Sequence, residues 1–145
     1  GQQVGPARLA FVGSAKHPLA TPRQLAVTEL PDLPLLLREP GSGTRDTFLR
    51  ALAEALSLST SPALPHAITL GSTTTIIATS RGGGGVGVLS SRAVAGDLAS
   101  GALVELVVRN FVAQRPLTAI WLGRVPTPLA QELIAIAAQA SVKRR

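Results

Sequence analysis

The sequence predicts an α/β fold, in which strands and helices alternate along the chain. Short apolar runs bounded by glycine, proline or charged residues are typical of strands that are buried on both faces. Two of these runs end in a turn rich in glycine and hydroxyl groups, at residues 41–44 and 71–75, and each turn leads into a helical pattern. A chain of 145 residues that is 46% hydrophobic can form one domain or two small lobes.

The first half of the chain predicts two strands, a long connector and one helix. Residues 8–12 and 35–37 are the apolar runs expected as strands. The connector between them carries four prolines, which favour extended chain with one helical turn near residues 25–30. Residues 44–56 predict an amphipathic helix with Asp46 in its first turn, where the helix dipole favours negative charge. The apolar stripe of this helix consists of Phe48, Leu49, Leu52 and Leu56.

The second half continues the alternation of strands and helices. Strands are predicted at residues 67–70, 86–89, 103–108 and 117–122, and helices at 76–80, from Ser90 or Ser91 to about Leu98, and from Thr127-Pro128 onward. Gly101 is expected to stop the middle helix. The glycines at residues 82–85 predict a turn that ends one helix and reverses the chain into the next strand. The last helix carries an apolar face of Leu129, Leu133, Ile136, Ala137 and Ala140.

The two hydroxyl-rich turns predict a seat for an anion or a polar ligand. A strand that ends in such a turn and feeds a helix points backbone N–H groups and the positive end of the helix dipole at whatever lies beyond. Arg45 can add a charge-assisted contact to a carboxylate. The alternative is that Ser42, Thr44 and Ser72 only cap their helices. We expect both turns to lie at the carboxyl ends of neighbouring strands, so that their backbone amides converge and open on one cleft.

Catalytic and metal chemistry are not expected. His17 and His66 each lie beside a proline in a loop-like segment, with no nucleophile or carboxylate at a recognisable spacing. The chain has no cysteine and its eight acidic residues are spread singly, so that neither a metal site nor a cofactor is predicted. We therefore expect a binding module and not an enzyme.

The net charge of +6 does not by itself indicate nucleic-acid binding. Three of the fourteen basic residues form the terminal Lys143-Arg144-Arg145, and aromatic residues, on which bases stack, make up only 3% of the chain. No apolar run approaches the roughly 20 residues of a membrane span, and no signal peptide is evident, so we expect a cytoplasmic protein without membrane contact. The absence of methionine indicates a piece excised from a longer protein.

Four segments resemble, in order and spacing, the effector-binding domain of LysR-type transcriptional regulators. They are "HPLA", "LPLLLREPGSGTRDTFLRALAEAL", "LGSTTTIIATSRGGGGVGVLSSRAVAGDLASGALVEL" and "RPLTAIWLGRVPTPLAQELIAIA". The resemblance covers residues 8 to about 140. The run of four glycines departs from the family's usual alternation of glycine with small apolar residues.

This resemblance implies a periplasmic-binding-protein-like (type 2) fold, with one complete lobe plus the C-terminal part of the other and a small effector held between lobes. Residues 1–19 would end the first lobe and cross over, residues 20–107 would form the second lobe, and residues 108–145 would return to the first lobe with a C-terminal helix and a basic tail. We expect the chain to self-associate as a dimer or tetramer, because without most of the first lobe the apolar edge near residues 117–122 and the apolar stripe of the last helix are left partly uncovered. The resemblance implies that DNA is contacted only through a helix-turn-helix domain, which is absent from this chain.

The family's pocket positions in the second lobe match the same two turns. The expected effector is a small carboxylate. The residues expected to bind it are Ser42, Gly43, Thr44, Arg45, Ser72, Thr73, Thr74 and, as part of an apolar wall, Leu89. The alternatives are a solute-binding protein of the same fold and, more weakly supported, an enzyme built on it.

Overall fold

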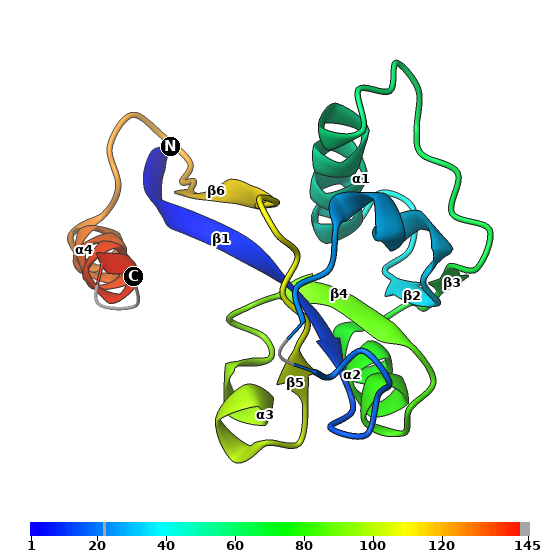
Figure 1. The fold of residues 1–145 in the computed structure, drawn as a ribbon. Helices are drawn as coiled ribbons and strands as arrows, with labels where there is room; N and C mark the ends of the chain where they lie inside the picture. The colour runs from blue at the N-terminus through cyan, green and yellow to red at the C-terminus, as the bar shows by residue number, and fades with distance from the viewer. Residues whose placement is uncertain (22, 143–145) are drawn as a thin grey trace. The chain divides into compact units, whose positions relative to one another are not determined.

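A computed structural model describes residues 1–21 and 23–142 of the chain (Figure 1). The basic tail predicted at Lys143-Arg144-Arg145 lies outside these residues. The chain forms two compact units. The larger unit is Arg8–Ala113, and the smaller unit joins Gly1–Ala7 to Gln114–Arg145. The assignment of residues 1–19, 20–107 and 108–145 to the lobes of the family fold stays a prediction.

A six-stranded sheet has the strand order β3-β2-β4-β1-β5, with β6 paired to β1. Its strands are β1 (Gln2–Gly13), β2 (Leu35–Leu37), β3 (Ile68–Thr69), β4 (Val86–Ser90), β5 (Val104–Glu105) and β6 (Gln114–Ala119). Strand β2 pairs in parallel with both β3 and β4, whereas β1 is antiparallel to β4 and β5. The carboxyl ends of β2, β3 and β4 therefore meet at one edge of the sheet.

The three leucines of β2 enter the core on both faces of the sheet. Side chains alternate along a strand, so that Leu35 and Leu37 join one cluster of buried residues and Leu36 joins the other. Each of the three is at most 1% exposed. A strand without polar side chains is thus explained by burial on both sides, as is usual for strands in parallel pairing.

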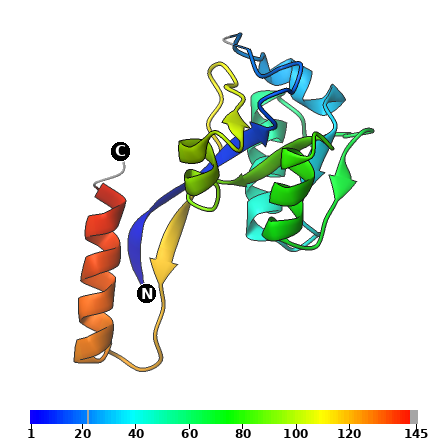
Figure 2. The ribbon, with the colours of Figure 1, turned by 90° about the horizontal axis from the view of Figure 1, so that it is seen from below.

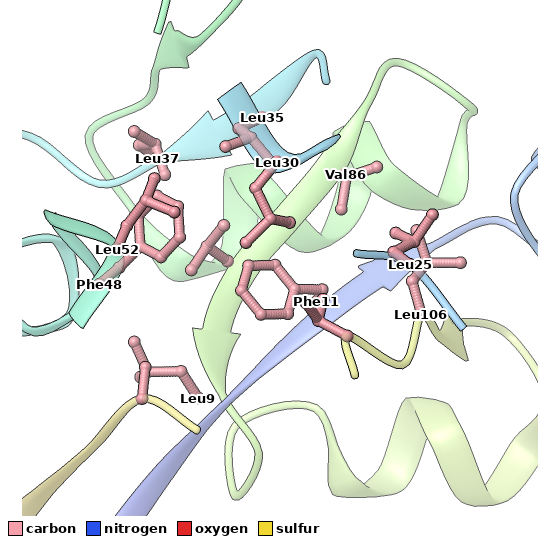
Figure 3. Packing of buried hydrophobic residues seen from close by; sticks show 13 residues of the cluster. Leu9, Phe11, Leu25, Leu30, Leu35, Leu37, Phe48, Leu52, Val86 and Leu106 are labelled. Carbon is pink, nitrogen blue, oxygen red and sulfur yellow. The ribbon is translucent and has the colours of Figure 1, made fainter. Parts of the chain in front are cut away.

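Helices α1 (Gly43–Ala55) and α2 (Thr73–Arg81) cover these two faces. Helix α1 brings Phe48 and Leu52 onto the cluster that holds Leu35 and Leu37 (Figure 3). The ring of Phe48 meets that of Phe11 edge to face, with centroids 5.7 Å apart. Helix α2 brings Ile76 onto the opposite cluster. The predicted amphipathic helix over residues 44–56 is confirmed, with its start one residue earlier.

The long connector contains the single helical turn that its sequence predicts, as the 3-10 helix η1 (Val27–Asp32). Further along, the strand predicted at residues 103–108 is present as β5, followed by a hydrogen bond from the Leu106 N–H to the Phe11 carbonyl at 2.8 Å and by an isolated bridge between Val108 and Leu25. This bridge ties the segment after β5 to the long connector before β2. The Leu25 N–H donates to the Val107 carbonyl and the Arg109 N–H donates to the Leu25 carbonyl, each at 2.8 Å.

Several predicted element boundaries are wrong. Strand β1 begins at Gln2 and not at residue 8, and helix α2 begins at Thr73 and not near residue 76. Helix α3 (Ala95–Ser100) has Val94 as its N-cap residue, and Ser90 and Ser91 do not cap it. A turn precedes the helix instead, closed by the Ala93 N–H donating to the Ser90 carbonyl at 2.9 Å. Strand β6 begins at Gln114 and ends before residues 120–122, because pairing with β1 and not apolar content defines it.

The predicted glycine turn at residues 82–85 is confirmed. Gly82 is the C-cap residue of α2, and the chain then reverses into β4. Gly85 has a φ of +152°, and a Cβ at this position would lie 2.5 Å from the Pro34 carbonyl oxygen. Only glycine fits there without strain, because both the dihedral angle and the close approach of the backbone exclude a side chain.

The smaller unit leaves much apolar surface exposed. Its helix α4 (Pro128–Val142) lies beside the first residues of β1 (Figure 2), where Ala138 and Val142 line a hollow with Val4 and Pro6. Large apolar side chains of this unit that are exposed include Ile120, Leu122, Leu129, Leu133 and Ile136. Among the described residues, no helix combines the length and the apolar character needed to span a membrane.

The packing of α2 on β4 makes a testable prediction at Gly87. A Cβ there would lie 2.8 Å from Ser80 Oγ, 2.9 Å from Ile76 Cγ2 and 3.2 Å from Val12 Cγ2. Gly87→Ala should therefore lower the free energy of unfolding by about 1–3 kcal/mol through overpacking, as measured by urea denaturation. Gly96→Ala is the matched control, because nothing lies within 4 Å of its added Cβ. Equal stability of the two variants would contradict the packing described.

Candidate functional site

The two hydroxyl-rich turns leave the sheet at the same edge. Strands β2 and β3 are parallel neighbours with Leu37 opposite Thr69, and the Leu70 N–H extends their pairing by donating to the Leu37 carbonyl at 2.8 Å. The chain turns into α1 after β2 and into α2 after β3. The predicted position of the two turns at the ends of neighbouring strands is confirmed. That they open on one cleft stays a prediction. We call residues 38–45 and 69–74 at this edge the turn site.

Two arginines join the two halves of the turn site. Arg38 Nη1 donates to Thr73 Oγ1 at 3.1 Å, across the two turns. Arg45 Nη1 donates to the Arg38 carbonyl oxygen at 2.9 Å and to Thr69 Oγ1 at 3.1 Å. Arg45 thus reaches from α1 to the end of β3, and its guanidinium stays within the site.

Arg38 is also paired with its neighbour Glu39. Arg38 Nε donates to Glu39 Oε2 and Nη2 donates to Oε1, both at 2.8 Å, which is a bidentate arrangement. The two side chains are 25% and 41% exposed. The hydrogen bonds from Arg38, followed by one from its own backbone, lower the pKa of the Glu39 carboxyl from its ordinary 4.5 to about 2. The same pairing raises the pKa of Arg38.

The hydroxyl group of Ser72 caps a helix, whereas that of Ser42 does not. Ser72 caps α2, because its Oγ accepts from the Thr75 N–H at 3.0 Å and also contacts Thr75 Oγ1 at 2.8 Å. Ser42 is the N-cap residue of α1 but makes no side-chain capping bond. The capping alternative therefore accounts for Ser72 and not for Ser42.

Backbone N–H groups complete the turn site. Gly43 and Thr44 open α1, and Thr73 and Thr74 open α2, so that their N–H groups precede the first bond within each helix. The earliest such bonds run from Asp46 in α1 and from Ile76 in α2. The two helix N-termini therefore present donors and positive dipole ends on the side where the strands end.

Leu89 reaches the same sheet edge but does not face outward. It lies near the carboxyl end of β4 and is 1% exposed, within the core cluster that also holds Leu36 and Ile76. Its side chain supports the edge from inside the protein. Whether any part of Leu89 contacts a ligand stays a prediction.

Arg38, Glu39 and Thr69 also belong to this site, and the sequence did not predict them there. The signal for the first two was present, because a charged pair follows directly after a strand made only of buried leucine. Charged residues at that point lie where a strand ends and the chain leaves the core. Thr69 gave no such signal, since its role depends on the register of β3 against β2.

The histidines lie away from the turn site. His17 Nδ1 accepts from the Leu19 N–H at 3.1 Å, and the ring lines a hollow of about 520 Å³ with Lys16 and Arg81. His66 is exposed before β3. Within the described part of the chain, no three residues of the metal-binding types gather in one group.

The chain is similar to regulators in both sequence and structure. A family model described as the LysR substrate binding domain matches residues 1–141. The RuBisCO operon transcriptional regulator of Acidithiobacillus ferrooxidans is 34% identical over 113 residues, which are 78% of this chain and 35% of that protein. The chain spans about a third of the length of the curated relatives it matches.

Solved structures show the fold. The regulatory domain of CcmR from Synechocystis PCC6803, in complex with 2-PG, matches with a TM-score of 0.73 at 24% identity over 97% of this chain and 65% of that one. The effector binding domain of QuiR, in complex with shikimate, matches with a TM-score of 0.64 at 15% identity over 98% of this chain and 65% of that one. The predicted periplasmic-binding-protein-like (type 2) fold class is confirmed.

The Arg38 pairing makes a prediction about Glu39. Because the pKa of Glu39 is lowered to about 2, the stability that the pair contributes is complete above pH 4.5 and is lost as the pH falls through about 2. In Arg38→Gln the pKa of Glu39 should rise toward 4.5, as measured by NMR titration of the side-chain carboxyl carbon. Arg23→Gln, which removes the partner of Glu29, should leave Glu39 unchanged. A Glu39 that titrates near 4.5 in the unaltered chain would contradict the pairing.

Proposed function

The chain belongs to the LysR substrate-binding domain family, and we propose that it senses a small carboxylate at the turn site on behalf of a LysR-type transcriptional regulator. The observation that carries this proposal is the Arg38–Thr73 hydrogen bond, which joins the two helix N-termini into one site. The proposed ligand-binding residues are those of the two turns expected from the sequence, with Arg38 added to them, while Leu89 supports the sheet edge from within the core.

The physical chemistry of the turn site favours a negatively charged ligand. Each helix N-terminus stabilises a nearby anion by about 0.3–1 kcal/mol. The guanidinium groups of Arg38 and Arg45 add donors whose geometry matches a carboxylate. Ser42, Thr44 and Thr73 supply hydroxyl groups between them. Small-molecule ligands in the CcmR and QuiR domains support a sensing role of the same kind here.

Ligand binding would act on transcription through parts of the protein outside this chain. The curated relatives are named as transcriptional regulators, several of them of the helix-turn-helix type, which favours a regulator over a solute-binding protein or an enzyme. We propose that the effector shifts the two lobes, and through them the helix-turn-helix domains that contact DNA. A cytoplasmic location follows from that role.

Self-association of the smaller unit is also proposed. On α4, Leu129 is 68%, Leu133 58% and Ile136 62% exposed, and after β6, Leu122 is 99% exposed. Large apolar side chains that gather on one surface are usually covered by a partner. We propose that a second copy of the chain covers them, forming a dimer or a tetramer.

The carboxylate proposal is tested by calorimetric titration of organic acids into the chain. Thr73→Val removes the acceptor of Arg38, and Thr44→Val removes a hydroxyl from the first turn of α1. Each should weaken binding about fivefold, because a hydrogen bond is worth about 1 kcal/mol. Thr60→Val, exposed in the loop after α1, is the matched control and should bind normally. A ligand without negative charge, or carboxylate binding that neither variant alters, would overturn the assignment.

Sedimentation of the chain at tens of micromolar tests the association. A dimer or larger species is expected, and Leu133→Glu should shift it toward the monomer, because a charge on the covered surface of α4 would be desolvated. Leu58→Glu, which changes an apolar side chain of the larger unit that is 44% exposed, is the control. A monomer in the unaltered chain would contradict the proposal.

A further inference from the structure

The Glu39 carboxylate accepts two hydrogen bonds from Arg38, the arginine that we propose contacts the carboxylate of the ligand. We propose that Glu39 makes the turn site selective for singly charged carboxylates over doubly charged ones. This inference rests on the proposed function, since it concerns the charge of the ligand that the same site accepts. In this proposal Glu39 discriminates between ligands by their charge, which the hydroxyl and N–H groups of the two turns do not do.

The hydrogen bonds of Arg38 leave a limited space for a ligand. A guanidinium has five N–H groups. Glu39 takes the Nε hydrogen and one on Nη2, and Thr73 takes one on Nη1. One hydrogen on each of Nη1 and Nη2 remains for a ligand. A ligand carboxylate can accept from these N–H groups without displacing Glu39.

Arg45 is held by fewer of its N–H groups than Arg38, because both of its hydrogen bonds run from Nη1. Its Nη1 is committed to the Arg38 carbonyl oxygen and to Thr69 Oγ1, which fixes the guanidinium against the ends of β2 and β3. A ligand carboxylate at the remaining N–H groups of Arg38 lies beside Glu39 and near both helix N-termini. A second negative charge on the same small molecule then also lies near Glu39, whose repulsion opposes any gain from a contact with Arg45.

The size of the effect follows from distance and exposure. A ligand carboxylate on Arg38 lies roughly 7 Å from the Glu39 carboxylate on the same guanidinium. In a water-like medium, the repulsion between the two lowers the affinity about threefold for each negative charge of the ligand. The Arg38 and Glu39 side chains are 25% and 41% exposed, so that solvent keeps the effect near this range. A ligand with two charges is thus disfavoured about threefold more than a ligand with one.

Asp46, the other carboxylate near this turn, does not replace Glu39 in this role. It lies in the first turn of α1 and is exposed, and among the described residues it makes no ion pair with Arg38 or Arg45. Glu39 is held against the guanidinium by two hydrogen bonds of 2.8 Å. Its charge is therefore fixed where the ligand binds.

The test compares propanoate with malonate, which have the same carbon skeleton and carry one and two charges near neutral pH. Each is titrated into the chain while the amide NMR signals of the two turns are followed. In Glu39→Gln, the affinity for malonate relative to propanoate should rise about threefold or more. Glu39→Asp keeps the charge and should keep the original ratio. Glu54→Gln, at the far end of α1, makes the same change in net charge and should also keep it.

The outcomes separate this inference from the function on which it rests. If both acids perturb the turns but Glu39→Gln leaves their ratio unchanged, or if Glu54→Gln raises it equally, Glu39 does not select on charge although the site stands. Weaker binding of both acids in Glu39→Gln without a change of ratio would show that Glu39 only positions Arg38, which also overturns the inference. If neither acid perturbs the turns in any of the proteins, the carboxylate site itself is wrong and the inference falls with it.

Discussion

The burial of β2 on both faces is the constraint from which the larger unit follows. Three successive leucines cannot be covered by one helix, because alternate side chains point to opposite faces of the sheet. A helix on each face is therefore required, and α1 and α2 supply them with Phe48 and Ile76. Parallel pairing of β2 with β3 then places the start of both helices at one edge. The candidate site is a product of how the core is covered.

The sequence predicts this arrangement well where periodicity is strong. The stripe of α1, the apolar run of β2 and the glycine turn before β4 each depend on neighbours in the sequence, and each lies as expected. The errors at strand ends occur where pairing with distant residues decides. Strand β6 is defined by β1, and the backbone after β5 bonds to Leu25, so apolar content alone could not place their ends.

The candidate site was predictable in its backbone and less so in its side chains. The glycine and hydroxyl content of the two turns predicts them from the sequence, and the turns lie close together because β2 and β3 are neighbours. The contacts of Arg38 with Thr73 and of Arg45 with Thr69 join residues 35 and 24 positions apart. No local pattern carries such distances, because they depend on strand register. The confirmed family membership supplied the function class, and the structure supplied the arginine that links the turns.

The absence of a side chain at Gly87 has a consequence for how this sequence can change over time. Helix α2 lies so close to β4 that the nearest atom to a Cβ at position 87 would be Ser80 Oγ, which is buried and has no hydrogen-bond partner among the described residues. Sizes at the two positions are therefore linked, and a substitution tolerated at one depends on what stands at the other. Homologous proteins that carry alanine at position 87 are expected to have a smaller or displaced residue opposite it, so the two positions should vary together.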